Sequence, residues 1–263
     1  MRSYLSIFKA RILSLFQYRL AAIAGICTQI FWGIIKVMII TAFYTQSIKS
    51  QPISLLQAIT FIWLGQAFLQ LLPWNIDKEL EEQVRTGNVV YELARPLDLY
   101  WLWFSRAMAM RIVPTILRSI PLFLIVSLFF DFSYPVSLNA AIAFFISLIF
   151  AALLSSAITT IVIISLFWTI SGEGIKRLLP SIVMIFSGMI VPLPLFPKWS
   201  QLFLDIQPFR GLIDIPCRLY TGVIPTEDAI FYLGFQFFWI LIFVFLGKWI
   251  MNKSIKRFVI QGG

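Results

Sequence analysis

The sequence predicts an all-α integral membrane protein with six transmembrane helices, an N-terminal amphipathic interfacial helix, and short re-entrant helices between spans five and six. Hydrophobic residues make up 60% of the 263 residues and charged residues only 13%, whereas a soluble domain has roughly 25% charged residues. Apolar runs of about 20 residues, the length that lets a helix cross a bilayer, recur along the chain. The strand-length alternation of membrane barrels is absent, so these runs favour a helical bundle.

Residues 1–19 are expected to form the interfacial helix. Apolar side chains recur there at helical spacing, at Leu5, Phe8, Ile12, Leu15 and Phe16. Polar and basic side chains lie largely on the opposite side, at Arg2, Ser6, Lys9 and Gln17. Such a helix lies in the headgroup region, where its basic residues meet anionic lipid; a simple anchor without a partner fits the same pattern. Because charges interrupt the apolar residues, the stretch lacks the features of a cleavable signal peptide.

Six spans follow along one membrane domain that covers residues 1–263. They are expected at Leu20–Tyr44, Ile53–Trp74, Arg111–Phe130, Val136–Ile170, Leu178–Leu195 and Ala229–Ile250. The fourth is longer than the ~20 residues of a simple crossing, so it must tilt or extend beyond the bilayer. Three prolines, Pro192, Pro194 and Pro197, are expected to end the fifth. The halves of the chain show no internal repeat, which disfavours an inverted-repeat carrier.

The basic residues predict the orientation of these spans. Of the 21 Lys and Arg residues, two lie within spans and only four lie in segments on the side opposite the termini, at Lys49, Lys198, Arg210 and Arg218. The remaining fifteen share the side of the two termini. Because basic residues gather on the cytoplasmic side of membrane proteins, both termini are expected in the cytoplasm, as in a multi-pass protein of the cell (inner) membrane.

The inner segment 75–98, between spans two and three, holds six of the twelve acidic residues and cannot lie in lipid. Glu81 precedes Arg85 by four positions and Lys78 precedes Glu82 by four, and this spacing supports a short helix. Gly87 then provides a natural stop for that helix. The sequence therefore predicts a short cytosolic helix that ends at Gly87.

This inner helix has the features of a surface that receives force from a cytosolic partner. Glu81, Glu82 and Arg85 would make the polar contacts that orient it, and Val89 and Leu93 would supply apolar packing. Every inner loop must be polar, however, so a solvated helix without a partner has the same composition.

The outer segment 192–227 mixes helix breakers with apolar side chains. Prolines such as Pro192 and Pro194 prevent one continuous helix, while Phe209 and Leu212 could pack in short half-buried helices. Non-helical backbone at membrane depth needs cover by protein or contact with water. A re-entrant outer gate built from these four residues and an ordinary interfacial loop are both consistent with this pattern.

Two basic residues, Lys36 and Arg118, fall within spans. A cation at the centre of a bilayer costs about 2.5 to 3.5 kcal/mol on insertion scales, so each is a candidate for the translocation path or for a subunit contact. Snorkelling to an interface is the alternative for both. No acidic residue lies inside an expected span, which disfavours a proton relay.

Residue content excludes most catalytic chemistry. With no histidine and two cysteines, zinc sites and Cys–His nucleophile pairs are nearly excluded, so no catalytic residue, metal site or cofactor is expected in the chain. The Gly-x4-Gly-Lys-Ser/Thr phosphate loop is absent as well. The basic residues flank apolar runs instead of forming a soluble basic domain, which argues against nucleic acid as a partner and for the lipid bilayer.

The inner segment VRTGNVVYELARPL and the outer segments SGMIVPLPLFPKW and QPFRGLIDIPCRLYTG, in this order among six spans, resemble permease subunits of ABC-2-type exporters. The resemblance covers nearly the whole chain. It implies that residues 1–19 are a connecting helix, that the inner segment holds the coupling helix docking on an ABC ATPase, and that the outer segment forms re-entrant helices near the exit. It also implies a second permease chain, identical or related, and ATP and magnesium bound by the partner ATPase.

The resulting expectation is a permease subunit that moves a drug-, peptide- or lipid-like substrate outward with power from a separate ATPase. Two alternatives stay open. An ion-coupled secondary transporter is disfavoured by the missing intramembrane acids. An integral membrane lipid-modifying enzyme is disfavoured by the absence of histidine and of a buried acid pair.

Overall fold

The computed structural model describes residues 2–15, 19–48, 50–168 and 173–257, and this part of the chain is helical without strands. Four helices are long and apolar enough to cross a membrane: α2 (Arg19–Gln46), α6 (Leu99–Phe129), α7 (Leu138–Ser165) and α11 (Ala229–Arg257). Two further apolar helices, α3 (Leu55–Ala67) and α8 (Glu173–Phe186), are shorter. The all-helical membrane fold is thus confirmed with four candidate spans, and the count of six stays a prediction.

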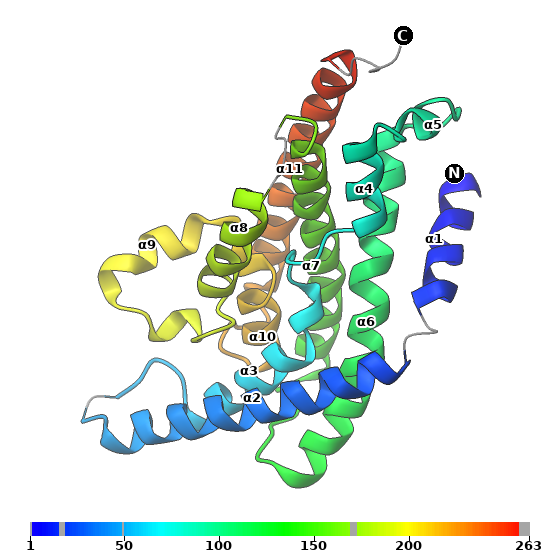
Figure 1. Ribbon diagram of the computed structural model, residues 1–263. Helices are drawn as coiled ribbons and strands as arrows, with labels where there is room; N and C mark the ends of the chain where they lie inside the picture. Colours follow the sequence, from blue (N-terminus) through cyan, green and yellow to red (C-terminus); the bar gives the residue numbers. More distant parts are fainter. Residues whose placement is uncertain (1, 16–18, 49, 169–172, 258–263) are drawn as a thin grey trace.

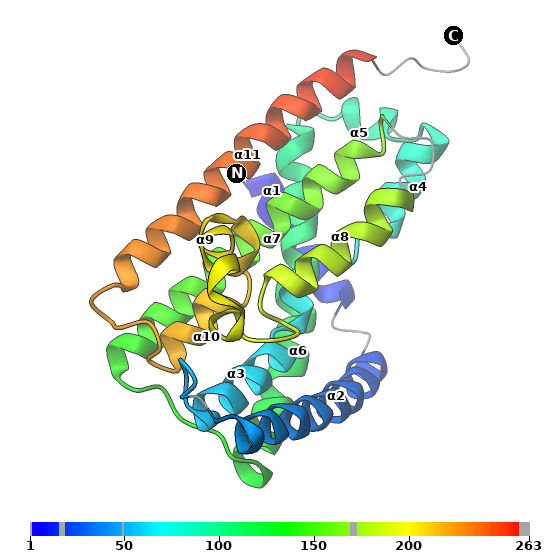
Figure 2. The ribbon, with the colours of Figure 1, turned by 90° about the vertical axis from the view of Figure 1, so that its left-hand side faces the viewer.

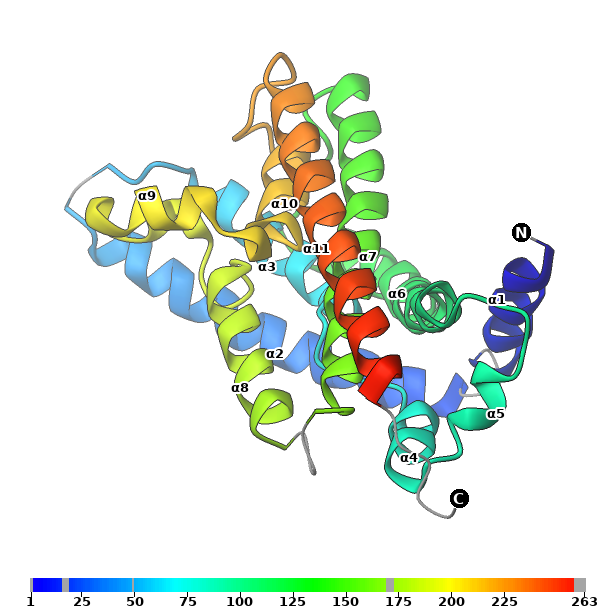
Figure 3. The same cartoon turned by 90° about the horizontal axis from the view of Figure 1, so that it is seen from above.

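Helix α7 is central to the bundle. It packs against α6 on one side and α11 on the other, and it also contacts α10 (Asp214–Tyr220). Helix α2 lies across one end of the bundle, transverse to α6, where it packs on α3 and α6 (Figures 1 and 2). Helix α1 (Arg2–Leu15) packs against α6, on the side of the molecule opposite α9 (Figure 3).

Helix α1 confirms a helical N-terminus but lies against protein on part of its surface. Phe8 and Ile12 are half-buried, whereas Ser6 and Lys9 are exposed, in agreement with the predicted two-sided pattern. The side chains of Leu5 and Leu15, and residues 16–18, lie outside the described part of the chain. Because α1 packs on α6, some of its apolar surface is covered by the bundle and not by lipid.

The second expected span is shorter as a helix than the run Ile53–Trp74 predicts. Ser54 caps α3 by accepting from the Gln57 N–H, and the Gln57 side chain accepts from the Ser54 N–H in return. The helix ends at Ala67 and passes into a 3-10 turn, η1 (Leu69–Leu71), before Pro73. The sequence stays apolar after Ala67, so hydropathy alone predicts an end at Trp74, several residues beyond the end of the helix.

Helix α6 begins at Leu99, twelve residues before the predicted start at Arg111. The Asp98 carboxylate accepts from the Trp101 N–H and caps this start. Arg106 and Arg111 interrupt the apolar pattern but lie inside the helix and are buried. The helix therefore begins twelve residues before the predicted span, and other parts of the chain cover the two arginines whose charges excluded these residues from that span.

The fourth and fifth spans also differ from their predicted ranges. Helix α7 ends at Ser165 and has 28 residues, so it exceeds the ~20 residues of a simple crossing by less than the predicted span does. The predicted end at Ile170 lies outside the described residues. Helix α8 ends at Phe186, well before Pro192. Gly188 follows with φ 84°, a left-handed conformation, so the helix ends before Pro192 is reached, although it contains Pro180.

Candidate coupling site and outer segment

The inner segment folds into two short helices beside α6. Helix α4 (Lys78–Thr86) begins after Asp77, whose carboxylate accepts from the Glu79 N–H, and ends at Gly87, which has φ 78°. Helix α5 (Val90–Leu93) follows directly. The predicted helix and its stop at Gly87 are therefore confirmed, and both follow from local sequence because a capping acid and a left-handed glycine set the ends.

Apolar side chains on the underside of this segment join the core at the inner end of the bundle. Leu80, Val84 and Val89 are buried in one cluster with Trp103 of α6. Leu93 is partly buried at the edge of the same cluster. Val89 is 0% exposed, so its apolar contact is made within the chain and it cannot touch a partner without local opening.

A buried arginine of α6 binds three carboxylates of the inner segment. The guanidinium of Arg106 lies 2.8 Å from the Asp77 carboxylate, 2.7 Å from that of Glu79 and 3.5 Å from that of Glu92. Asp77, Glu92 and Arg106 are all buried. Burial weakens screening by water, and the several partners of Arg106 satisfy its donors. This contact fixes α4 and α5 on α6.

Two further contacts extend this charged cluster. Arg11 of α1 lies 2.9 Å from Asp77 and 3.2 Å from Glu79. Trp103 donates its indole N–H to Glu92 at 2.8 Å. The cluster therefore connects α1, the start of α4, α5 and α6. We call these residues, Arg11, Asp77, Glu79, Glu92, Trp103 and Arg106, the inner clamp.

The opposite face of the inner segment is open. Glu82 is exposed, and Arg85 has 58% of its side chain exposed and lies 4.0 Å from Glu81. Tyr91 is 75% exposed, although a solvent-facing aromatic ring has no packing benefit within the chain. The segment thus has a buried, clamped side and a free rim that consists of Glu82, Arg85 and Tyr91.

The outer segment is a series of short helices, as its prolines predict. They are η2 (Leu193–Leu195), α9 (Lys198–Ile206), η3 (Pro208–Gly211) and α10. Pro192 is buried and Pro194 half-buried at the start, and Phe209 is half-buried. Leu212 is 0% exposed within the main apolar core. Its role in this conformation is packing, and the gate role of these four residues stays a prediction.

Side-chain amides cap carbonyls that the broken helices leave free. Gln207 donates to the Phe186 carbonyl at 2.8 Å, Gln236 of α11 to the Gly211 carbonyl at 2.7 Å, and Gln57 of α3 to the Thr221 carbonyl at 3.1 Å. Buried backbone groups without a partner cost stability, most severely away from water. The chain thus meets the requirement that irregular backbone be covered by protein.

Charged residues of the outer segment bind mostly one another. Asp214 is 0% exposed and lies 3.3 Å from Arg218 and 3.8 Å from Arg210, which in turn lies 2.7 Å from Asp205. Burial raises the pKa of the Asp214 carboxyl, while the guanidinium groups of Arg218 and Arg210 act in the opposite direction. Arg210 also lies over the ring of Tyr232 in α11.

A family model described as "ABC-2 family transporter protein" matches residues 51–262, most of the chain, including the inner segment 75–98 and the outer segment 192–227. The chain belongs to the ABC-2 transporter family. It is accordingly a transmembrane permease component of an ABC transporter and not itself a catalytic enzyme. Comparison with curated proteins found no significant match.

The two basic residues of the expected spans have contacts inside this ABC-2 chain. Lys36 of α2 donates from Nζ to the Met189 carbonyl at 2.8 Å, just after the end of α8. Arg118 of α6 lies over the backbone of α2 at Gly25, where an added Cβ would stand 2.4 Å from the guanidinium carbon. Each cation therefore joins α2 to another element, and a role in the translocation path or subunit contact stays a prediction for both.

The inner clamp was not predicted from the sequence. The sequence singled out Glu81, Glu82 and Arg85 from their spacing along one helix, but Asp77, Glu92 and Arg106 become partners only in the folded chain. One signal was present: Arg106 and Arg111 directly precede or interrupt a long apolar run, and a buried cation requires partners. Arg111 has them, since it donates to the Thr159 hydroxyl and the Asn75 carbonyl.

Proposed function

We propose that this ABC-2 protein is the permease subunit of an ATP-driven exporter, and that it moves a drug-, peptide- or lipid-like substrate outward with power from a separate ATPase subunit. The observation that carries the proposal is the two-sided inner segment: one face is fixed by the inner clamp, and the other presents Glu82, Arg85 and Tyr91. A surface that is firmly held on one side and exposes charged and aromatic side chains on the other suits docking of a motor.

The mechanism follows from how the segment is held. A flexible loop would deform under force and would not transmit it to the helices. Helices α4 and α5 are instead bound to α6 by buried ion pairs and by apolar packing of Leu80, Val84 and Val89. Displacement of the rim therefore moves α6 with it. Through Arg11 the same displacement reaches α1, so the N-terminal helix moves as part of the same unit.

The partners follow from this account. ATP and magnesium are bound by the ATPase, which supplies the phosphate loop that this chain lacks. A second permease chain, identical or related, completes the translocation path. The excess of basic residues beside both termini supports a cell-membrane protein with cytoplasmic termini. The outer segment is then the outer gate, in which the broken backbone lies at membrane depth under the cover of Gln57, Gln207 and Gln236.

Cross-linking tests the ATPase partner. In a background with Cys27→Ser and Cys217→Ala, a Tyr91→Cys variant is treated in native membranes with a short bifunctional thiol–amine reagent. We expect capture of a protein that contains a Gly-x4-Gly-Lys-Ser/Thr phosphate loop. Tyr134, equally exposed but far from the inner segment, provides the control: Tyr134→Cys should capture no such protein. If cysteines at other positions of the chain capture an ATPase in these membranes and Tyr91→Cys does not, the inner segment is not the docking site.

Thiol labelling tests the orientation. In the same background, Ser50→Cys and Lys198→Cys should react with a membrane-impermeant maleimide on intact cells, because both residues are exposed and lie in segments that the basic residues predict to be opposite the termini. Glu82→Cys should react only after permeabilisation. Labelling of Glu82→Cys on intact cells would reverse the orientation and place the inner segment where no ATPase could reach it.

A further inference from the structure

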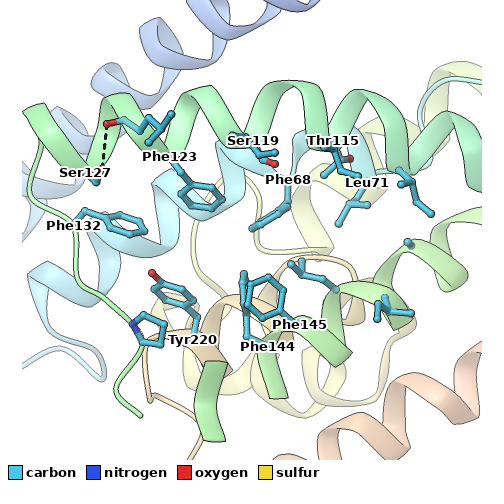
Figure 4. A pocket seen from close by; sticks show the side chains of 18 of the residues that line it. Phe68, Leu71, Thr115, Ser119, Phe123, Ser127, Phe132, Phe144, Phe145 and Tyr220 are labelled. Atoms are coloured by element: carbon cyan, nitrogen blue, oxygen red, sulfur yellow. Dashed lines mark hydrogen bonds between the residues drawn. The ribbon is translucent and has the colours of Figure 1, made fainter. Parts of the chain in front are cut away.

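A long apolar groove runs between α6 and α7, on a part of the molecule that the coupling mechanism does not use. Its volume is about 830 Å³. Figure 4 shows Phe123 and Phe132 on one side and Tyr220, Phe144 and Phe145 on the other, with side chains that point toward one another across it. The lining extends along α6 from Met108 to Ser127.

Two hydroxyl groups of the lining are turned back to their own helix. Thr115 donates to the Arg111 carbonyl at 2.6 Å, and Ser127 donates to the Leu124 carbonyl at 3.1 Å. A groove lined in this way offers few partners to water, which needs two to four polar contacts to be held. Its occupant must therefore be apolar along most of its length.

The groove opens onto the membrane-facing surface of this transmembrane protein. Ile116, Ile120 and Leu124 of α6 and Phe145 and Ile149 of α7 are exposed, and all five also line the groove. Between Met108 and Ser127 a helix rises about 28 Å, close to the ~30 Å thickness of bilayer hydrocarbon. The groove is thus continuous with the lipid interface of α6 and α7 over nearly its whole depth.

One end of the groove differs from the rest. Tyr134 lines it there and is 73% exposed, and Tyr220 lies nearby with its ring 5.9 Å from that of Phe132. Tyrosine is enriched where hydrocarbon meets headgroups, because its ring is apolar and its hydroxyl polar. This end therefore has the character of a headgroup boundary.

We propose that the groove binds an acyl chain of a membrane lipid, with the headgroup at the Tyr134 end. The site is distinct from the inner clamp and from the outer gate residues, although Tyr220 of α10 forms part of its wall and packs on Phe144 with ring centres 4.9 Å apart. An acyl chain in the groove therefore supports the outer segment from its membrane side.

Photolabelling tests the site. The purified chain is placed in nanodiscs of a phosphatidylcholine that carries a diazirine in one acyl chain, irradiated, and mapped by peptide mass spectrometry. Labelling should be several-fold higher on groove residues such as Ser119 and Leu148 than on α11 residues such as Phe238 and Phe245, which are exposed and do not line the groove.

Filling the groove should remove this excess. Ser119→Trp places a large side chain in the lining, and Ala152→Leu offers a milder filling if the first variant does not fold. Phe245→Trp on α11 is the matched control and should leave groove labelling unchanged. Equal labelling of groove and α11, unaffected by either filling variant, would mean contact with bulk lipid only and would overturn the proposal. Cross-linking of groove residues to a second chain, with no lipid adduct, would overturn it too.

Discussion

The inner and outer segments both interrupt the membrane helices with short helices, but they are held in different ways. In the inner segment, charges connect residues far apart in sequence: Arg11 and Asp77 are 66 positions apart, and Asp77 and Arg106 are 29 apart. In the outer segment, Arg210 pairs with Asp205 five positions away and Asp214 with Arg218 four positions away.

The outer segment is joined to the bundle by apolar packing of residues such as Leu212, by the stacking of Arg210 over Tyr232, and by neutral hydrogen bonds from glutamine amides to backbone carbonyls. Neutral hydrogen bonds contribute about 0.5 to 1.5 kcal/mol each, whereas breaking a buried ion pair costs about 3 to 5 kcal/mol. The polar contacts of the inner segment are therefore the stronger ones and hold it to α6, whereas the outer segment keeps its ion pairs to itself and meets the bundle through apolar packing and weaker polar contacts. That difference suits a coupling element and a gate.

The strongest test of this contrast is Arg106→Leu. Removal of the guanidinium leaves the buried carboxylates of Asp77 and Glu92 without their main partner, and we expect a loss of about 3 to 5 kcal/mol in stability, measured by thermal unfolding in detergent. Adding Asp77→Asn and Glu92→Gln to the same chain removes the unpaired charges and should restore part of the loss. A single variant as stable as the wild type would show that the inner clamp does not hold the segment.

A smaller loss is expected for Gln236→Leu. This substitution leaves the Gly211 carbonyl and the Ser147 hydroxyl without the amide that binds them, at a cost of about 1 to 3 kcal/mol. Gln46→Leu on the exposed end of α2 is the control and should have little effect. If Gln236→Leu were as harmful as Arg106→Leu, the proposed difference between the two segments would disappear.

Each segment contains a glycine in the left-handed conformation, and the two glycines differ in the space around them. Gly87 has φ 78° with no atom near an added Cβ, whereas Gly222 has φ 72° and an added Cβ would stand 2.6 Å from Val136. Gly87→Ala should cost about 1 to 2 kcal/mol from conformation alone. Gly222→Ala should cost more, because a clash adds to that strain. Equal unfolding temperatures for the two variants would contradict this ranking.

The smallest effect on stability is expected on the rim. Arg85 and Glu81 form a surface pair four positions apart on a helix, and such pairs contribute about 0.3 to 0.5 kcal/mol. Arg85→Ala should therefore unfold close to the wild type. A large destabilisation would mean that Arg85 belongs to the structural side of the inner segment and not to its free rim.

Local features of the fold could be predicted from the sequence, and distant contacts could not. The helix that ends at Gly87 follows from neighbouring residues: four-residue charge spacing, a capping Asp77 and a glycine. The start of α6 at Leu99 was missed because Arg106 and Arg111 look unsuited to a membrane helix until their partners are known. Those partners are residues 14 to 48 positions away, and the helical spacing of residues along the sequence does not predict contacts over that separation.

The candidate site was predicted in part for the same reason. Glu82 and Arg85 lie on the exposed rim as their helical spacing implies, but Val89, the residue before α5, is buried in one cluster with Trp103. The end of α8 was placed at prolines, although Gly188 ends the helix first. A glycine in the sequence shows that the backbone can adopt a left-handed conformation at that position, but not that it does so.

A matched control makes the functional test of the rim specific. The rim variant is the triple alanine variant of Glu82 and Arg85 on the rim and of Glu81, the half-buried partner of Arg85; it removes two acids and one base. Lys198, Glu227 and Asp228 are exposed near the outer segment and have the same charge composition, so their triple alanine variant is the control. Both variants should insert and unfold like the wild type, since neither set includes a residue of the inner clamp.

The most direct measurement is the amount of ATPase partner recovered with each triple variant, together with the rate of ATP hydrolysis by the recovered complex. The rim variant should lose the partner, or keep it with a hydrolysis rate that no longer differs from that of the free ATPase, while the outer control matches the wild type in both. Full recovery of the partner and an unchanged hydrolysis rate in the rim variant would contradict the coupling role and leave the inner segment a solvated helix.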